Sequence, residues 1–150
     1  MNEKGAAPFD LESLLHTAYG AQAEVEAKLA AAGLSLAKLS ALKALDEAGE
    51  PMPLSQLAER LSCVKSNITQ LVDRLEADGF VMREADPRDR RGKLAALTAE
   101  GRRACKEGST IREAAERELL TTLTADEASQ LATLLGKLRK SPGAALTGTP

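Results

Sequence analysis

The sequence predicts a mainly α-helical domain that carries one small β-hairpin, and three features support this fold class. Apolar residues recur at helical spacing towards both ends of the 150-residue chain. The middle of the chain holds two short helical segments, 54–61 and 63–75, with a turn between them. Two β-type segments then flank a turn rich in arginine. This length suits a single domain with a substantial core.

Two helices are predicted before the central segments. Asp10 is a suitable N-cap for a first helix from Leu11 to about Ala32. Ser35 is the expected cap of the next helix, whose leucines recur at every third position until Gly49-Glu50-Pro51 ends it. The first helix is rich in alanine, so each of its turns buries little and it needs a partner surface.

The segment 63–75 has one apolar and one polar helical face. The apolar stripe, which must be buried, is formed by Val64, Ile68, Leu71, Val72 and Leu75. The opposite face is formed by Lys65, Ser66, Asn67, Thr69, Gln70, Asp73 and Arg74. Amides and hydroxyls can bind base edges in a DNA major groove, and Lys and Arg can bind phosphates or guanine. The sequence therefore predicts a helix-turn-helix whose second helix binds double-stranded DNA.

A β-hairpin is predicted after this helix, which Asp78-Gly79 ends. Residues 80–85 and 93–97 are the expected strands, and the tip 86–92 holds proline, glycine and three arginines. An arginine-tipped hairpin beside a recognition helix can enter the neighbouring minor groove, whose potential is negative. Together the segments predict a winged helix-turn-helix.

Two further helices are predicted towards the end of the chain. Thr98 is a suitable N-cap for a helix that runs to about Thr122. Thr124 and Glu127 form a capping box that opens a last helix, with leucines on one face. Three long helices exceed what a small winged core can cover, so a homodimer is expected.

The charge distribution also favours DNA as a partner. The whole chain has a net charge of −2, whereas residues 60–93 carry 8 basic and 6 acidic side chains. Residues 88–93 alone carry 4 basic side chains and 1 acidic one. Local positive charge on an otherwise acidic molecule suits a protein that binds DNA through one face. A solvated surface turn is the alternative interpretation of the hairpin charges.

At these residues the chain resembles the MarR-type winged helix-turn-helix transcription regulators. The matching motifs are Leu57-Ala58-Glu59-Arg60-Leu61, the run from Asn67 to Gly79, and Asp86-Pro87-Arg88-Asp89-Arg90-Arg91 followed by Leu97-Thr98-Ala99-Glu100-Gly101. The resemblance implies one MarR-like domain over 1–150. Its expected parts are dimerisation helices at 10–33 and 98–140, a winged helix-turn-helix at 35–97 and a disordered tail at 141–150.

The resemblance also implies the DNA-binding residues. The helix would place Lys65, Ser66, Asn67, Thr69, Gln70 and Arg74 at the major groove and phosphates. Arg90 and Arg91 would serve the minor groove with Asp89 supporting Arg91, while Arg88 and Lys93 would clamp phosphates. Many members have a serine where this chain has Val64, so Ser62 or Ser66 would cap the helix or bind phosphate.

Regulation is less strongly indicated. In the family a small-molecule pocket forms where the dimer helices meet the winged domain, and His16 and Tyr19 are candidates to bind a phenolic or aromatic carboxylate effector. The alternative is that both are ordinary helix residues. Oxidation of Cys63 at the turn into the recognition helix is a second hypothetical switch. The simpler interpretation of Cys63 and of Cys105 is packing.

The predicted function is therefore that of a cytoplasmic transcription regulator, which acts as a repressor and is released by an effector. Two cysteines and one histidine give no disulfide framework or metal site, and no cofactor is expected. No apolar stretch approaches the roughly 20 residues of a membrane span, so no membrane partner is expected. The scattered glycines form no phosphate loop, and no enzyme is predicted. An activator, or a winged module that binds protein instead of DNA, remains open.

Overall fold

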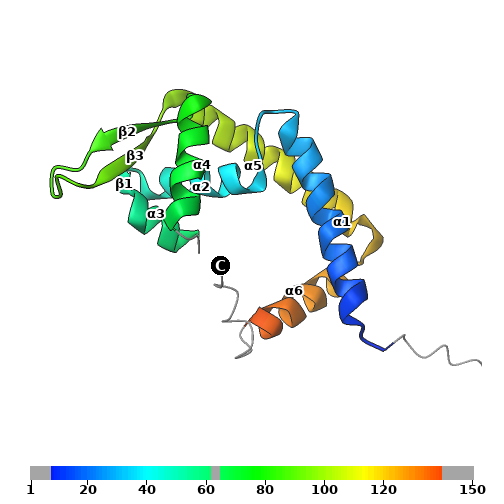
Figure 1. Ribbon diagram of the computed structural model, residues 1–150. Helices are drawn as coiled ribbons and strands as arrows, with labels where there is room; N and C mark the ends of the chain where they lie inside the picture. The colour runs from blue at the N-terminus through cyan, green and yellow to red at the C-terminus, as the bar shows by residue number, and fades with distance from the viewer. Residues whose placement is uncertain (1–7, 62–64, 140–150) are drawn as a thin grey trace, which may run out of the picture.

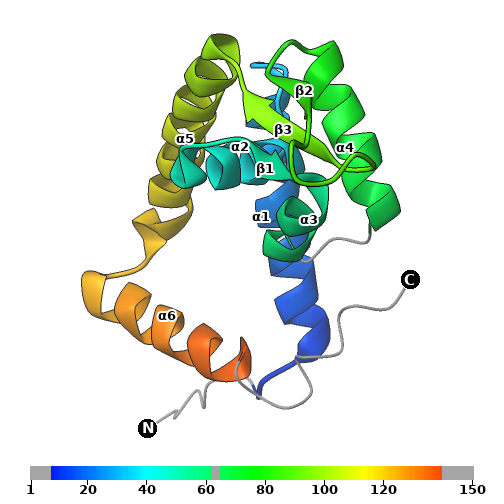
Figure 2. The same cartoon turned by 90° about the vertical axis from the view of Figure 1, so that its left-hand side faces the viewer.

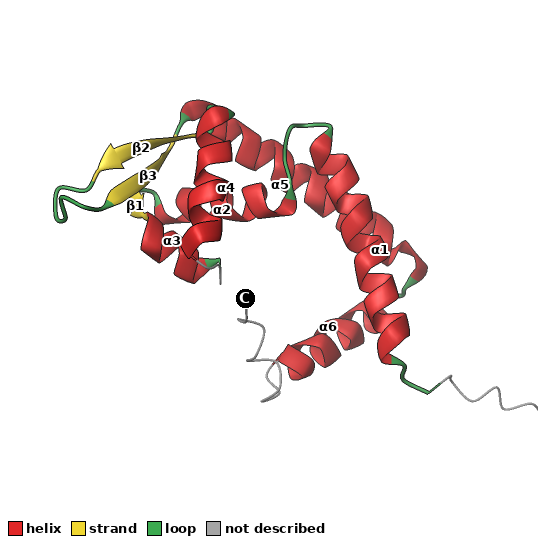
Figure 3. Cartoon of the chain, viewed as in Figure 1, coloured by secondary structure: helices red, strands yellow, loops and turns green. Residues whose placement is uncertain are grey.

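The computed structural model confirms a mainly helical fold with a small antiparallel sheet (Figure 3). It describes residues 8–61 and 65–139. The elements in chain order are α1 (Leu11–Ala30), α2 (Leu36–Ala48), β1 (Met52–Pro53), α3 (Leu54–Arg60), α4 (Lys65–Ala77), β2 (Val81–Ala85), β3 (Lys93–Leu97), α5 (Ala99–Leu119), the 3-10 turn η1 (Leu120–Thr122) and α6 (Ala125–Arg139). The expected tail at 141–150 lies outside the described residues.

The helix caps predicted at Asp10, Ser35, Thr98 and Thr124 are confirmed. The Asp10 carboxylate accepts hydrogen bonds from the backbone N–H groups of Glu12 and Ser13, at 3.2 and 3.1 Å. Ser35 accepts from the Lys38 N–H at 3.1 Å and so caps α2. Each cap satisfies N–H groups that the first helical turn leaves without an intrahelical partner. Single residues of the sequence therefore predict where these two helices begin.

Two helix ends differ from the prediction. The first helix ends at Ala30 instead of about Ala32, and the chain turns through Gly33, whose φ is 71°. The helix expected to reach Thr122 ends as α5 at Leu119 and tightens into the 3-10 turn η1. Both differences lie in the last turn of a helix, where the backbone hydrogen-bond pattern changes. The residue types of the sequence predict this change poorly.

The core lies between α2, α3, α4 and the base of the sheet. Fully buried leucines, valine and isoleucine come from every one of these elements; they include Leu39, Leu42, Leu57, Ile68, Val72, Leu75 and Val81. Leu29 joins this cluster from the end of α1. The apolar stripe of α4 thus faces inward as predicted, which leaves its polar face outside.

The sheet has three strands in the order β1-β3-β2. The two predicted strands pair in register from Val81 opposite Leu97 to Ala85 opposite Lys93. The third strand, β1, was not predicted: Met52 pairs with Ala95 and Pro53 with Leu94. Two residues that include a proline carry too short a pattern to predict a strand, and an edge position tolerates the missing N–H of proline.

The long helices extend away from this winged part. Figure 1 shows the β2–β3 hairpin projecting at the left, α1 at the right and α6 at the bottom, and Figure 2 shows α6 apart from the sheet. Helices α1 and α2 both pack on α5, and Lys28 of α1 forms an ion pair with Glu118 of α5. None of the helices within the described residues is long and apolar enough to cross a membrane.

Several large apolar side chains of these helices are exposed in the single chain. They belong to the start of α1, the end of α5 and one face of α6: Leu11, Leu15, Tyr19, Leu119, Leu131, Leu134, Leu135 and Leu138. Exposed apolar groups of this number are typical of interaction surfaces.

Candidate nucleic-acid interface

Helix α4 presents the predicted polar face to solvent. Asn67, Thr69, Gln70 and Arg74 are exposed, while Ile68 and Leu71 between them are buried. Lys65 and Ser66 belong to the first turn of α4, but their side chains lie outside the described part of the chain. Ser62, Cys63 and Val64, which precede the helix, also lie outside it. The N-cap predicted at Ser62 or Ser66 and the redox switch suggested for Cys63 therefore stay predictions.

The hairpin tip is folded by its aspartates, which leaves its cations outside. The Asp86 carboxylate accepts from the Arg88 N–H, and the Asp89 carboxylate accepts from the Arg91 N–H, both at 2.9 Å. Such Asx turns fix the backbone without using the arginine side chains. The exposed side chains at and beside the tip are Arg88, Arg90, Arg91 and Lys93. Asp89 thus supports Arg91 by accepting a hydrogen bond from the Arg91 backbone N–H.

The tip and the polar face of α4 belong to the same small body. Strand β2 packs against α4, and its partner β3 pairs with it along the whole hairpin. Figure 1 shows α4 beside the base of the hairpin, with the tip extending beyond it. The structure therefore brings together two sets of residues that the sequence separates: the polar side chains of 67–74 and the cations of 88–93.

Arg83 of β2 is a functional candidate that sequence reasoning missed. Its guanidinium donates to the carboxylates of Asp73 and Glu76 of α4, and also to the backbone carbonyl of Thr69 at 3.4 Å. Burial alone lowers the pKa of Arg83, but the hydrogen bonds and charges of the two carboxylates raise it above its usual value. Arg83 is therefore a permanent cation at the junction of helix and hairpin.

Asp73 lies on the polar face as expected, but it is engaged by Arg83. Its side chain is 58% exposed and that of Glu76 is 42% exposed, whereas the Arg83 side chain is 22% exposed. The acidic charge of the recognition-helix candidate is thus compensated by the neighbouring strand. No spacing rule within one helix predicts this pair, because its partners lie on different elements.

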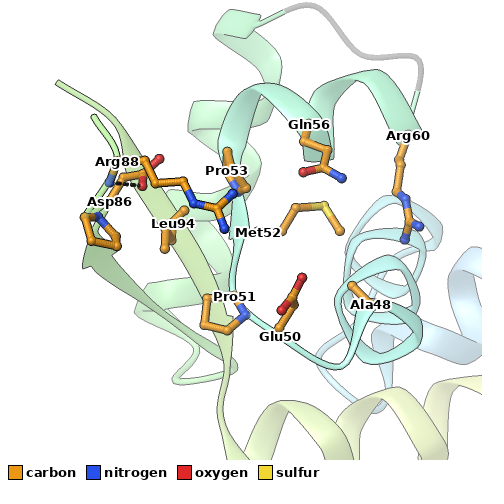
Figure 4. A pocket seen from close by; sticks show the side chains of 11 residues that line it. Ala48, Glu50, Pro51, Met52, Pro53, Gln56, Arg60, Asp86, Arg88 and Leu94 are labelled. Carbon is orange, nitrogen blue, oxygen red and sulfur yellow. Dashed lines mark hydrogen bonds between the residues drawn. The ribbon is translucent and has the colours of Figure 1, made fainter. Parts of the chain in front are cut away.

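A pocket of about 420 Å³ lies behind the hairpin, between β1, α3 and the start of the tip (Figure 4). Arg88 and Asp86 line one side, and Gln56 and Arg60 line the other. One guanidinium nitrogen of Arg60 donates to the backbone carbonyl of Ala44 at 3.2 Å. Charges of both signs line this pocket, among them those of Glu50 and Arg60.

The candidate effector residues lie away from the winged part. His16 and Tyr19 are exposed on the first half of α1, beside Leu11 and Leu15, in a shallow depression of about 540 Å³. The single chain therefore does not bring them to the junction with the winged domain (Figure 1). Within residues 8–61 and 65–139, no group of three or more His, Cys, Asp or Glu side chains is arranged to hold a metal ion.

Cys105 is buried in α5, with 5% of its surface exposed. Burial, aided by the nearby carboxylates of Asp46 and Glu47, raises the pKa of the thiol. A thiol that stays protonated at neutral pH is a poor nucleophile. This placement agrees with a packing role for Cys105.

Comparisons with known proteins agree with this arrangement. The model of the MarR family matches residues 34–93. The chain is 37% identical over 87 residues to the uncharacterized HTH-type transcriptional regulator YkoM of Bacillus subtilis, an alignment that covers 58% of this chain and 56% of that protein. It is 32% identical over 109 residues to the HTH-type transcriptional repressor MdtR of Bacillus subtilis, with 73% of this chain and 70% of that protein covered.

Solved structures show the same similarity. A mutant of MarR from Escherichia coli in complex with operator DNA has a TM-score of 0.75 and 28% identity, with 85% of this chain and 92% of that chain covered. The sequence matches to curated relatives are shorter than this structural match: the chain spans about half the length of YkoM, 56%. The likeness thus extends in structure beyond the winged segment into the long helices.

Proposed function

The chain belongs to the MarR family of transcription regulators, and from this premise we propose that it binds a pseudo-palindromic operator in double-stranded DNA as a homodimer and represses transcription. One observation carries the proposal: the exposed polar face of α4 lies on a helix against which β2 packs, and β2 leads into the exposed cationic tip. A helix and a projecting arginine hairpin in this relation suit adjacent major and minor grooves.

The polar face of α4 supplies the major-groove contacts in this proposal. Asn67 and Gln70 have amides that can pair with adenine, and Arg74 can bind guanine or phosphate. Lys65, Ser66 and Thr69 complete the set at the helix and its first turn. Base contacts of this kind set sequence preference, whereas phosphate contacts set register.

The hairpin supplies the minor-groove and phosphate contacts. Arg90 and Arg91 enter the minor groove, where the potential of DNA is most negative at narrow A·T-rich steps. Asp89 holds the backbone of Arg91 in place, as the 2.9 Å hydrogen bond supports. Arg88 and Lys93 bind phosphates on either side.

The exposed apolar faces of α1, α5 and α6 support the proposed homodimer. A twofold dimer buries these faces in both copies at once, because the same patch serves each subunit. It would also place two α4 helices about one DNA turn apart, roughly 34 Å, which matches a palindromic site.

We further propose that a small aromatic or phenolic effector releases the DNA by binding better to a form that does not fit the operator. His16 and Tyr19 remain the candidate effector residues, and the depression that they line on α1 with Asp10 and Glu12 would be closed by the second copy of the chain in the proposed dimer. A thermal-shift screen of aromatic acids tests this part. A compound that raises the melting temperature and weakens DNA binding is expected, and a flat response across a broad set would contradict it.

A winged module that binds protein instead of DNA is the rival from another class. A protein-binding face normally carries apolar or aromatic anchors. Among the large apolar side chains that are exposed in the described part of the chain, none belongs to α4. The polar helix face therefore favours DNA.

Binding to DNA from the intergenic region upstream of its own gene tests the proposal. Fluorescence anisotropy would be measured at about 50 and 200 mM salt, with unrelated competitor DNA present. We expect binding that survives the competitor and weakens steeply with salt, because released counterions contribute much of the affinity. No preferred sequence there or after selection from random DNA would contradict the proposal.

A further inference from the structure

Arg83 is the last residue of β2 whose side chain is partly buried. It shares a face of β2 with Val81, which is buried in the core with 2% exposure. Beyond Arg83 the side chains of Glu84 and Ala85 are exposed, and so are most of those at the tip. A motion of β2 relative to α4 at this position therefore has to disturb the contacts of Arg83.

These contacts form a fork on the exposed side of α4. One terminal nitrogen of the guanidinium binds Glu76 and the other binds Asp73. Asp73 and Glu76 are three residues apart, which places both carboxylates on the same side of the helix. A planar guanidinium that binds two fixed carboxylates resists rotation, whereas a single ammonium group would bind them one at a time.

We infer that Arg83 is a positioning residue for DNA binding: it fixes the angle between the hairpin and α4, so that Arg91 and the α4 face reach their two grooves together. This inference rests on the proposed DNA-binding function. The ion pair has a second effect, since it compensates two carboxylates that would otherwise repel nearby phosphates. Arg83 itself is engaged by the protein and is not assigned a DNA contact.

A double-mutant cycle with Arg91 tests this inference. If hairpin and helix bind as one unit, Arg91→Ala should weaken operator binding about tenfold in the wild-type background. In the Arg83→Lys background, and equally in Asp73→Asn/Glu76→Gln, the same change should cost only about two- to threefold, because the loosened hairpin no longer delivers Arg91 reliably. Circular dichroism would show that each variant remains folded, as expected for exposed ion pairs.

The two backgrounds separate positioning from other roles of Arg83. If charge compensation alone mattered, Arg83→Lys would behave like the wild type. If Arg83 itself bound DNA and did not position the hairpin, the Arg91→Ala factor would stay near tenfold in Asp73→Asn/Glu76→Gln. Either result would overturn the inference, as would an Arg91→Ala factor that stays near tenfold in both backgrounds.

Footprinting gives an independent readout. In Arg83→Lys, α4 should still bind the major groove while the hairpin reaches the minor groove less often. Protection of the minor groove from hydroxyl radicals should therefore weaken more than protection of the major groove from methylation. A role in folding alone would weaken both equally and would contradict the inference. If the wild type does not bind an operator, the proposed function is overturned together with this inference. If it binds, but Arg91→Ala costs the same factor in every background, only this inference is overturned.

Discussion

Gly101 is the residue whose missing side chain the fold depends on most directly. It is buried in the first turns of α5, where a Cβ atom would lie 2.0 Å from the backbone oxygen of Phe80 and 2.8 Å from a Leu97 methyl. A backbone oxygen cannot rotate out of the way as a side chain can. The glycine of the family motif at this place thus has a packing reason.

We predict that Gly101→Ala destabilises the protein by about 2–3 kcal/mol, because overpacking outweighs the helix propensity of alanine. Gly108→Ala on the same helix is the matched comparison. A Cβ there would meet methyl groups of Leu34 and Leu39 at 2.8 Å, and these can shift. Urea unfolding should therefore give a smaller loss for Gly108→Ala. Equal losses would show that the contact with Phe80 is not decisive.

The Cys105 thiol is predicted to be unreactive in the folded protein. Burial raises its pKa, so the thiolate is scarce at neutral pH and forms only as the pH rises above the usual range. Alkylation by iodoacetamide at about pH 7.5 should be tenfold or more slower in the native protein than in urea. Mass spectrometry of the peptide that contains Cys105 gives the rate. Rapid native alkylation would restore a redox role for this residue.

At the scale of elements, Thr98 joins the recognition helix to the long helix α5. Its hydroxyl donates to the Gly79 carbonyl at 2.7 Å and accepts from the Gly101 N–H at 3.0 Å. The backbone N–H of Thr98 also donates to the Phe80 carbonyl at 3.0 Å. The end of α4 and the start of α5 are thus tied at one residue.

Thr98→Val should cost about 1–2 kcal/mol, since the methyl that replaces the hydroxyl neither caps α5 nor binds Gly79. Thr98→Ser keeps the hydroxyl and should retain most of the stability. Thermal unfolding of the two variants against the wild type provides the measurement. A serine variant as unstable as the valine variant would mean that the methyl packing of Thr98, and not its hydrogen bonds, matters.

Elements with local signals were predicted well. Asp10, Ser35, Thr98 and Thr124 each cap a helix as expected, because a cap depends on one side chain and the next three N–H groups. The strands expected at 80–85 and 93–97 are observed at 81–85 and 93–97, because the turn between them has strong residue preferences.

Features that depend on distant partners were not predicted. β1 forms because β3 offers it a free edge, and nothing in Met52-Pro53 alone indicates that edge. The pairing of Arg83 with Asp73 and Glu76 likewise depends on how the hairpin folds back on α4. At the candidate interface the exposed residues were therefore predictable, whereas the residue that orients them was not.

In the molecule as a whole, α6 is the helix with the most exposed leucines in the described residues. Leu134 and Leu138 are 56% and 53% exposed in the single chain, on a helix that lies apart from the sheet (Figure 2). Burying the exposed half of one such leucine contributes about 1 kcal/mol, and a twofold interface counts each residue twice. The proposed dimer would remove this apolar surface from water.

Leu134→Glu should shift the protein from dimer to monomer at micromolar concentration, because an unpaired carboxylate in the interface is strongly unfavourable. Met82→Glu is the matched control, since Met82 is 52% exposed but lies on the hairpin strand β2. Sedimentation equilibrium should show a dimer for the control. A monomeric wild type, or a Leu134→Glu dimer, would remove α6 from the interface.

The most direct test of the central claim is the operator affinity of Arg91→Ala. Arg103→Ala is the matched control, because Arg103 is an exposed arginine of α5 with a side chain 74% exposed. We predict that Arg91→Ala loses about tenfold in affinity while the control and the oligomeric state stay unchanged. Equal losses of operator affinity in both variants would mean that the effect arises from net charge alone. Unchanged affinity of Arg91→Ala would contradict the claim that the hairpin and α4 bind DNA together.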